Sequence, residues 1–312
     1  FYIPSNWKRC PLCYEKDPSE WEIFKNDIPG YLYFGSQLLS IPLVGYARAQ
    51  ILERLGITRV DEIARLNPSR LAHFPDIKNA KDRSFAARIP MVINYAKAIM
   101  TGKTIITGTP QMFEEKHDNA FFFDLEYDPV GTQTRGSVGV FLIGMMDIKG
   151  ATQQYFAEDP KEEEQLLLKF NEWLATKQPF LITFSSTSAD EPQLRNAYRK
   201  FGIPCEALNK VRFLDLFYDI IFTQSPQKQK VYLPLCGSMG AKHISDYFGY
   251  KEPKGLQIHD GLQALTAYKD YLKHKRKKIK DQLLLYNQCD LQRTAIIYNK
   301  LRQIFLGDTG HW

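Results

Sequence analysis

The chain has 312 residues, of which 44 % are hydrophobic and 24 % are charged, as in an ordinary globular protein. No apolar run is long enough to cross a bilayer and the N-terminus lacks a signal-peptide pattern, so we expect no membrane partner. The formal charge of +6 permits a nucleic-acid partner. Five scattered cysteines do not suggest a disulfide framework, so we expect a cytoplasmic protein. Because the chain begins with Phe1 rather than Met, we expect a fragment or a processed product.

Residues 1–28 form the first predicted segment, in which Cys10 and Cys13 make a Cys-x-x-Cys pair. Two thiolates on one tight turn can share a tetrahedral zinc ion. A structural zinc site normally needs a second pair, and the remaining cysteines are distant in the sequence. We therefore expect two reduced cysteines, with a structural zinc site at Cys10 and Cys13 as the alternative.

The second predicted segment, residues 29–105, is helical in character. It contains LLSIPLVGYARAQILERLGITRVDEIARL at 38–66, where an apolar helix is expected to meet a short turn at 42–45. A second helix is expected after that turn, and Gly-Ile-Thr at 56–58 ends it before a third helix begins. The pattern resembles a helix-hairpin-helix unit, and a weaker echo follows in the sequence.

The helix-hairpin-helix resemblance implies a small all-α domain that contacts nucleic acid. In such units the backbone N–H groups of the turn, here at Gly45, hold a phosphate without reading sequence. Arg48 is expected to add a phosphate contact, as are Lys78 and Lys81. The alternative is a plain helical bundle in which Gly45 and Gly56 only stop helices.

The third predicted segment, residues 112–312, opens with strands. Three strands are expected at 121–128, 136–150 and 151–158, followed by a helix at 160–178, a fourth strand at 179–186 and a helix at 189–204. The fourth strand is apolar nearly throughout, as a buried parallel strand is. Two long helices are expected at the C-terminus. Three antiparallel strands that lead into α/β crossovers predict a mixed sheet flanked by helices.

Two acidic residues follow the apolar start of the first strand, in FFFDLEYDP at 121–129. Asp124 and Glu126 lie two residues apart on a strand, so both carboxylates point to one face. Like charges this close repel each other, and burial raises the cost. A Mg²⁺ or Mn²⁺ ion removes the cost, because hard cations prefer carboxylate oxygen. The pair predicts a metal site, with an exposed acidic strand end as the alternative.

The last helix carries a further acid in DQLLLYNQCDLQRTAIIYNKL, residues 281–301. Tyr286 and Asp290 are spaced i, i+4 and share one helical face. Asp290 lies beside an apolar stripe, where a carboxylate needs a cation or a base as partner. The alternative is an exposed Asp at the edge of the stripe.

The order of these motifs resembles that of DEDD-type nucleases of the RNase H-like superfamily, in the DEDDy subgroup that carries the tyrosine. The second motif, SSTSADEPQLRNAY at 185–198, is similar to that of the YprB-type domain in predicted RecB-family nucleases. Asp190 stands where this family has its acid, whereas Ser185-Ser186 replaces an Asn-Gly pair. The adjacent Glu191 is the alternative acid.

This resemblance implies a nuclease that hydrolyses phosphodiester bonds of DNA or RNA, with 3′–5′ exonuclease-like activity. It implies two Mg²⁺ or Mn²⁺ ions about 4 Å apart, held by four carboxylates: Asp124, Glu126, Asp190 and Asp290. Tyr286 is expected to orient the attacking water, since a phenol with a pKa of about 10 is a poor base. Lys242, in a Ser-x-x-Lys-like stretch that the family shares, is expected to contact a phosphate.

A basic run, KHKRKKIK at 273–280, precedes the third motif. Lys275, Arg276 and Lys277 are expected to guide a nucleic-acid backbone towards the site. A solvated helix face is the alternative for this run.

Two other functions are compatible with parts of the pattern. A catalytically inactive nucleic-acid-binding module on the same scaffold is permitted by the altered second motif. A transposase or integrase of the same superfamily is disfavoured, because the Tyr-x-x-x-Asp ending does not fit its DDE-like set of acids and no late Glu stands in that role.

Overall fold

The computed structural model describes residues 36–72, 74, 77, 84–114, 119–134, 139–223, 227–237 and 239–307. The predicted contacts at Cys10, Cys13, Lys78 and Lys81 lie outside these described residues. The chain divides into two compact units: unit 1 comprises Phe1–Thr109 with Ile220–Ile244, and unit 2 comprises Pro110–Asp219 with Ser245–Trp312. Among the described helices, none combines the length and the apolar character needed to cross a membrane.

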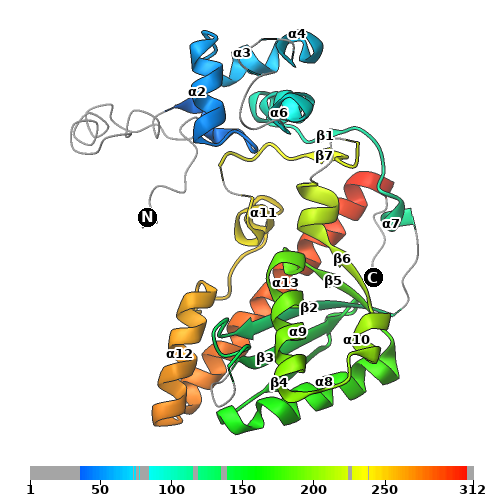
Figure 1. The fold of residues 1–312 in the computed structure, drawn as a ribbon, viewed down its shortest axis with the longest axis vertical. Coiled ribbons are helices and arrows are strands. Elements are labelled where there is room, and N and C mark those ends of the chain that lie inside the picture. Colours follow the sequence, from blue (N-terminus) through cyan, green and yellow to red (C-terminus); the bar gives the residue numbers. More distant parts are fainter. Residues whose placement is uncertain are drawn as a thin grey trace, which may run out of the picture. The chain divides into compact units, whose positions relative to one another are not determined.

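Unit 1 is helical in its described N-terminal part, which confirms the expected helical region (Figure 1). Its helices are η4 (Gln37–Ser40), α2 (Tyr46–Arg54), α3 (Val60–Ala64), α4 (Pro68–Ala72) and α6 (Ser84–Thr101). Helix α6 buries Phe85, Ile89 and Tyr95 in the core of this unit. Strand β1 (Ile105–Ile106) pairs antiparallel with β7 (Val231–Tyr232), which joins the second stretch of unit 1 to the first.

An apolar helix precedes the turn of unit 1, as the sequence suggests, and it is short. It is the single 3₁₀ turn η4, and Ile41 already has an extended backbone with φ −84° and ψ 123°. Pro42 explains this ending, because a proline disfavours the helical conformation of the residue before it. Gly45 then begins α2 as its N-cap, as the expected turn at 42–45 requires.

Unit 2 is built on a five-stranded mixed sheet in the order β4-β3-β2-β5-β6, which confirms the expected fold class. The strands are β2 (Ala120–Tyr127), β3 (Val140–Asp147), β4 (Thr152–Phe156), β5 (Phe180–Thr183) and β6 (Arg212–Asp215). Strands β2, β3 and β4 are antiparallel neighbours, and β5 runs parallel to both β2 and β6. No strand is expected from the sequence at β6, since a short apolar run followed by the π-helix η7 (Leu216–Ile221) does not distinguish strand from helix.

Helices cover both faces of this sheet (Figure 1). One face carries α8 (Glu163–Lys177), α9 (Asp190–Phe201) and α10 (Glu206–Lys210); the other carries α12 (Gly261–His274) and α13 (Lys277–Leu306). The alternation of β2 distributes its side chains between these layers. Phe123 stacks on Phe170 of α8, whereas Phe122 meets Tyr298 of α13. The carboxylates of β2 therefore face α13.

The remaining short elements are α7 (Gln111–Glu114), η5 (Pro160–Glu162), η6 (Ser186–Ser188) and α11 (Ala241–Tyr247). The 3₁₀ turn η6 matters for function, because it leads from β5 into the first residue of α9.

A buried ion pair ties α8 and α9 to the start of β3. Lys200 Nζ lies 2.7 Å from Glu163 Oε2, and the two side chains are 2 % and 0 % exposed. Glu163 also accepts the backbone N–H groups of Gly139 and Val140, and Lys200 donates to the carbonyl oxygen of Gly131. Every charge in this network has hydrogen-bond partners, which is the condition under which a buried pair is tolerated.

We expect Lys200→Met to lower the free energy of unfolding by about 3–5 kcal/mol, because Glu163 is left buried without its cation. The double variant Glu163→Gln/Lys200→Met removes that charge and should lose less than the single variant. Urea unfolding followed by circular dichroism measures both changes. Lys210→Met, at an exposed lysine of α10, is the matched control. A cost below about 1 kcal/mol for Lys200→Met would contradict the role of the pair.

Candidate metal centre

Three carboxylates from two elements meet on the α13 face of the sheet. Asp124 and Glu126 of β2 and Asp290 of α13 each offer one ligand oxygen, and these atoms all lie within 4.8 Å of one another. Strand alternation places the two β2 residues on one face, and α13 packs against that face. The donors are all carboxylate oxygens, which fit a hard divalent cation such as Mg²⁺ or Mn²⁺.

Burial and mutual repulsion raise the pKa values of these acids. Burial raises the pKa of Glu126, which is 6 % exposed, and the charges of Asp124 and Asp290 raise it further. Burial likewise raises the pKa of Asp124, followed by the charges of Asp290 and Asp190. Each carboxylate is therefore easier to protonate than an exposed one. A bound divalent cation would reverse the balance and favour the ionised forms.

Asp190, the first residue of α9, is coupled to this group without belonging to it. Burial raises the pKa of Asp190 to about 7, and the charges of Asp215 and Asp290 contribute. Its own charge raises the pKa of both Asp124 and Glu126, so it is near enough to act on them electrostatically. Glu191 is differently engaged, because its Oε1 lies 2.9 Å from the guanidinium of Arg195 one turn further along α9.

The loop before α9 is held by Asp215, a residue that the sequence analysis does not single out. Its buried carboxylate accepts the backbone N–H groups of Ser185 and Thr187 at 2.8 Å, and those of Phe217 and Tyr218. Ser185 has φ 61°, in the left-handed region that Asn and Gly adopt most readily. Ser185 therefore holds a backbone conformation that a serine seldom adopts.

Tyr286 lies one helical turn before Asp290 and hydrogen-bonds to it. Burial raises the pKa of Tyr286 far above its ordinary value, and the charges of Asp290, Glu126 and Asp124 add to the effect. The phenol is thus held neutral. It can donate a hydrogen bond at this site, and it cannot serve as a base at neutral pH.

Two further residues of α13 complete the site and are absent from the sequence-based set. Arg293 is 2 % exposed and forms ion pairs with Asp290 and with Glu252, which precedes α12. Asn287 donates a hydrogen bond of 2.7 Å to Oδ2 of Asp124. The spacing of Asp290 and Arg293 is a visible i, i+3 pair. No local spacing points to Asn287, because its partner is distant in the sequence.

The residues of unit 1 that are predicted to contact nucleic acid lie at the start of α2 and on α11. Gly45 is exposed and begins α2 without a side-chain cap. The guanidinium of Arg48 donates to the carbonyl oxygen of Leu43 at 2.6 Å and lies over the ring of Phe85. Lys242 is exposed on α11. Arg48 therefore supports the turn, and its predicted phosphate contact stays a prediction, as does that of Lys242.

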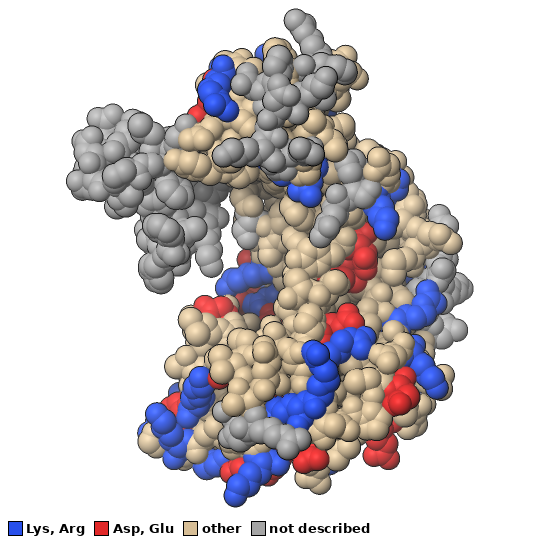
Figure 2. Space-filling view, in the orientation of Figure 1, with Lys and Arg blue, Asp and Glu red and all other residues tan. Residues whose placement is uncertain are grey.

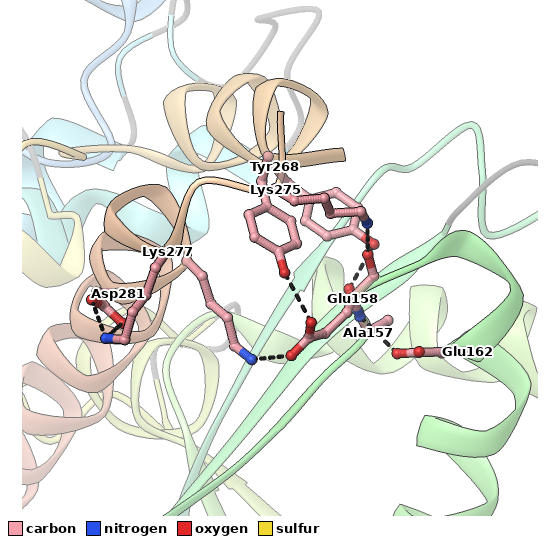
Figure 3. A network of polar contacts seen from close by, with 9 residues as sticks. Ala157, Glu158, Glu162, Tyr268, Lys275, Lys277 and Asp281 are labelled. Atoms are coloured by element: carbon pink, nitrogen blue, oxygen red, sulfur yellow. Dashed lines mark hydrogen bonds and ion pairs between the residues drawn. The ribbon is translucent and has the colours of Figure 1, made fainter. Parts of the chain in front are cut away.

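The basic run between α12 and α13 is largely occupied by contacts within unit 2 (Figure 3). Lys275 donates to the carbonyl oxygen of Glu158 and lies over the ring of Tyr271, and Lys277 pairs with Asp281 at 2.7 Å. Arg276 is exposed and is the N-cap residue of α13. Where charges gather over the helices of unit 2, basic and acidic side chains lie close to each other (Figure 2). These contacts give the run a structural role, and its predicted role in guiding nucleic acid stays a prediction.

The raised pKa values predict that the protein becomes less stable as pH rises. Because the folded acids bind protons more readily than the unfolded ones, the free energy of unfolding should fall as pH rises from about 4, the unfolded pKa of Asp, through about 7, the folded pKa of Asp190. Mn²⁺ should therefore raise the melting temperature more at pH 8 than at pH 5. Differential scanning fluorimetry with and without MnCl₂, at matched ionic strength, measures this.

The control for this experiment is Asp124→Asn, which removes one charge from the cluster. The metal-free variant should melt at or above the temperature of the wild type at pH 8, and Mn²⁺ should shift it little. An equal shift by Mn²⁺ at both pH values, or in both proteins, would contradict a metal centre at these carboxylates.

A family model and a solved structure each match a part of this chain. Among solved structures, the family B DNA polymerase from the hyperthermophilic archaeon Pyrobaculum calidifontis is similar, at 16 % identity and a TM-score of 0.41 over 58 % of this chain. The similar part spans only 24 % of that polymerase. No curated protein matches the sequence. A family model described as the RNase H superfamily matches residues 121–302, which is more than half of the chain. The chain therefore belongs to the RNase H superfamily.

Proposed function

We propose that the chain is a metal-dependent nuclease of the DEDDy type, which hydrolyses phosphodiester bonds of DNA or RNA with 3′–5′ exonuclease-like activity. The observation that carries the proposal is the convergence of Asp124, Glu126 and Asp290 in a fold of this superfamily. The charge coupling of Asp190 to that group and the hydrogen bond from Tyr286 to Asp290 support the DEDDy assignment. The order of the motifs supports similarity to the YprB-type domain of predicted RecB-family nucleases.

The proposed mechanism assigns a part to each group. Asp124, Glu126, Asp190 and Asp290 would hold two divalent cations, Mg²⁺ or Mn²⁺. Bound there, such cations would supply an activated water and stabilise the charge that develops on the leaving oxygen. Tyr286, neutral and buried, would orient the attacking water by accepting a hydrogen bond at its hydroxyl oxygen, because its one O–H is donated to Asp290. The apolar core beneath β2 keeps its two carboxylates in place.

We also propose that the segment 29–105 binds nucleic acid as a helix-hairpin-helix-like domain, with phosphate at the start of α2. Gly45, Tyr46 and Ala47 are exposed at the start of this helix, where its first backbone N–H groups lie, and Gly45 is its N-cap residue. Such groups, together with the helix dipole, favour an anion. The contact is to backbone phosphate, so it supports binding without sequence preference.

The decisive activity test compares two neighbouring acids of the second motif. With Mn²⁺ and 3′-labelled or 5′-labelled single strands of DNA or RNA, we expect Asp190→Asn to lower the rate by about a thousandfold or more, because a metal ligand is lost. Glu191→Gln should retain activity within about tenfold, since Glu191 is paired with Arg195. The position of the label that is released first gives the polarity.

Three outcomes would revise this proposal. Loss of activity in Glu191→Gln with retention in Asp190→Asn would exchange the roles of the two acids. Activity that survives Asp124→Asn would place the chemistry elsewhere. Binding of DNA or RNA without cleavage by the wild type would favour the alternative of an inactive nucleic-acid-binding module.

The phosphate contact at α2 is tested by Ala47→Glu. A carboxylate in the first turn of a helix interacts favourably with the helix dipole and stabilises the helix by a few tenths of a kcal/mol. Thermal stability should therefore be unchanged or slightly higher. The same charge repels phosphate, so affinity for DNA or RNA should fall and its dependence on salt should weaken. Fluorescence anisotropy across a salt series measures both effects. Met100→Glu, an exposed position of unit 1, is the control, and an equal effect there would exclude a specific contact.

A further inference from the structure

A chain of two amide side chains runs to Asp124 from the edge of the sheet. Gln154 of β4 donates from Nε2 to the carbonyl oxygen of Leu284 at 2.9 Å and to Oδ1 of Asn287 at 2.8 Å. Asn287, which is fully buried, donates from Nδ2 to Oδ2 of Asp124 at 2.7 Å. Three elements, β4, α13 and β2, are therefore joined by hydrogen bonds that end on one carboxylate of the metal centre.

The direction of this chain is fixed by its first link. A backbone carbonyl oxygen can only accept a hydrogen bond, so the Gln154 atom next to Leu284 is the amide nitrogen. That nitrogen then requires an acceptor at Asn287, which turns the Asn287 oxygen towards Gln154 and its nitrogen towards Asp124. An amide that would otherwise be free to flip thus presents a donor to the carboxylate.

Gly144 of β3 provides the space that Asn287 occupies. Gly144 pairs with Asp124 on one side and with Gln154 on the other, so it lies between the two ends of the chain. A Cβ atom at residue 144 would lie 2.1 Å from Oδ1 and 2.9 Å from Cγ of Asn287. Gly144 is not among the described glycines with positive φ. The glycine is therefore required for the close approach of Asn287 and not for backbone conformation.

We propose that Asn287, oriented by Gln154 and admitted by Gly144, is a positioning residue for the divalent cation at Asp124. Its hydrogen bond fixes the rotation of the Asp124 carboxylate, so that this ligand is already oriented when the cation binds. Because the amide is neutral, it does this without adding a further negative charge beside the carboxylates. The inference rests on the proposed metal-dependent function and assigns to that site a residue outside the four acids and the tyrosine.

Mn²⁺ affinity in the absence of nucleic acid tests this role directly, by isothermal titration calorimetry at pH 8. We expect Asn287→Ala to weaken Mn²⁺ binding about 10–100-fold, the usual effect of losing a group that orients a metal ligand. Asn299→Ala, at an exposed asparagine of the same helix, should bind as the wild type does. Near-ultraviolet circular dichroism checks that each variant is folded.

The space requirement is tested by a double-mutant cycle. Gly144→Ala should weaken Mn²⁺ binding although it keeps Asn287, because the added methyl group displaces the amide. In the double variant Gly144→Ala/Asn287→Ala the conflict is gone, so affinity should be no lower than in Asn287→Ala alone. Additive losses would mean that Gly144→Ala acts through general damage to the sheet and would overturn the proposed role of Gly144.

Gln154→Glu serves if the buried variants do not fold, since Gln154 is only half-buried on an edge strand. A carboxylate cannot donate to Leu284 or Asn287, so the amide of Asn287 turns and presents its oxygen to Asp124. Mn²⁺ binding should weaken, whereas the added negative charge alone would strengthen it. Wild-type affinity in Asn287→Ala, or stronger binding in Gln154→Glu, would overturn the inference.

Failure of the proposed function gives a different result. A wild type that binds Mn²⁺, with weaker binding in Asn287→Ala, but cleaves neither DNA nor RNA would contradict the nuclease and support the positioning role. A wild type that cleaves, with Asn287→Ala equal to it in Mn²⁺ affinity, would contradict the positioning role alone. The absence of Mn²⁺ binding by the wild type would overturn both.

Discussion

The mutual repulsion of Asp124, Glu126 and Asp290 is the constraint on which the arrangement of unit 2 depends. Ligand oxygens within 4.8 Å of one another, in a site where burial already raises each pKa, cost free energy that the surrounding structure must offset. The apolar layers on both sides of the sheet offset it by holding β2 and α13 together. A pair of elements packed less firmly would separate until the charges were solvated.

The groups around the cluster reduce this cost in different ways. Arg293 brings a buried positive charge to Asp290 and shares it with Glu252. Asn287 and Tyr286 bring neutral donors, to Asp124 and Asp290 respectively. These groups do not offset the whole cost, since burial still raises the pKa values of Asp124 and Asp290. A divalent cation would offset the cost that remains, and this is why the carboxylates favour one.

Local sequence patterns were sufficient for those parts of the site that depend on a single element. Strand alternation places Asp124 and Glu126 on one face, and helical spacing does the same for Tyr286 and Asp290. The mixed sheet follows from the order of its strands, with the exception of β6, whose short apolar run continues into η7 and does not distinguish a strand from a helix. Which of the predicted residues act in catalysis is not decided by their placement and stays a proposal.

Long-range packing decided the features that the sequence did not indicate. Asn287 has its partner 163 residues away, and Gly144 is defined by the side chain that fills its space. Asp215 holds the loop at Ser185 from a neighbouring strand. The basic run adds contacts that its composition did not indicate, because Lys275 and Lys277 bond within unit 2, and its predicted contact with nucleic acid stays a prediction. Composition shows which charged residues are present, and the packed structure shows which contacts they make.

Helix α13 continues without interruption from Lys277 to Leu306 and carries four groups of the site within two of its turns. Tyr286, Asn287, Asp290 and Arg293 therefore move as one rigid body relative to β2. A slip of the helix by a single residue, about 1.5 Å along its axis, would detach the ligand, the amide and the phenol from their partners together. Beyond the site the same helix packs through Tyr298 on Phe113 and Phe122, and these contacts help to hold its position along β2, on which all four groups depend together.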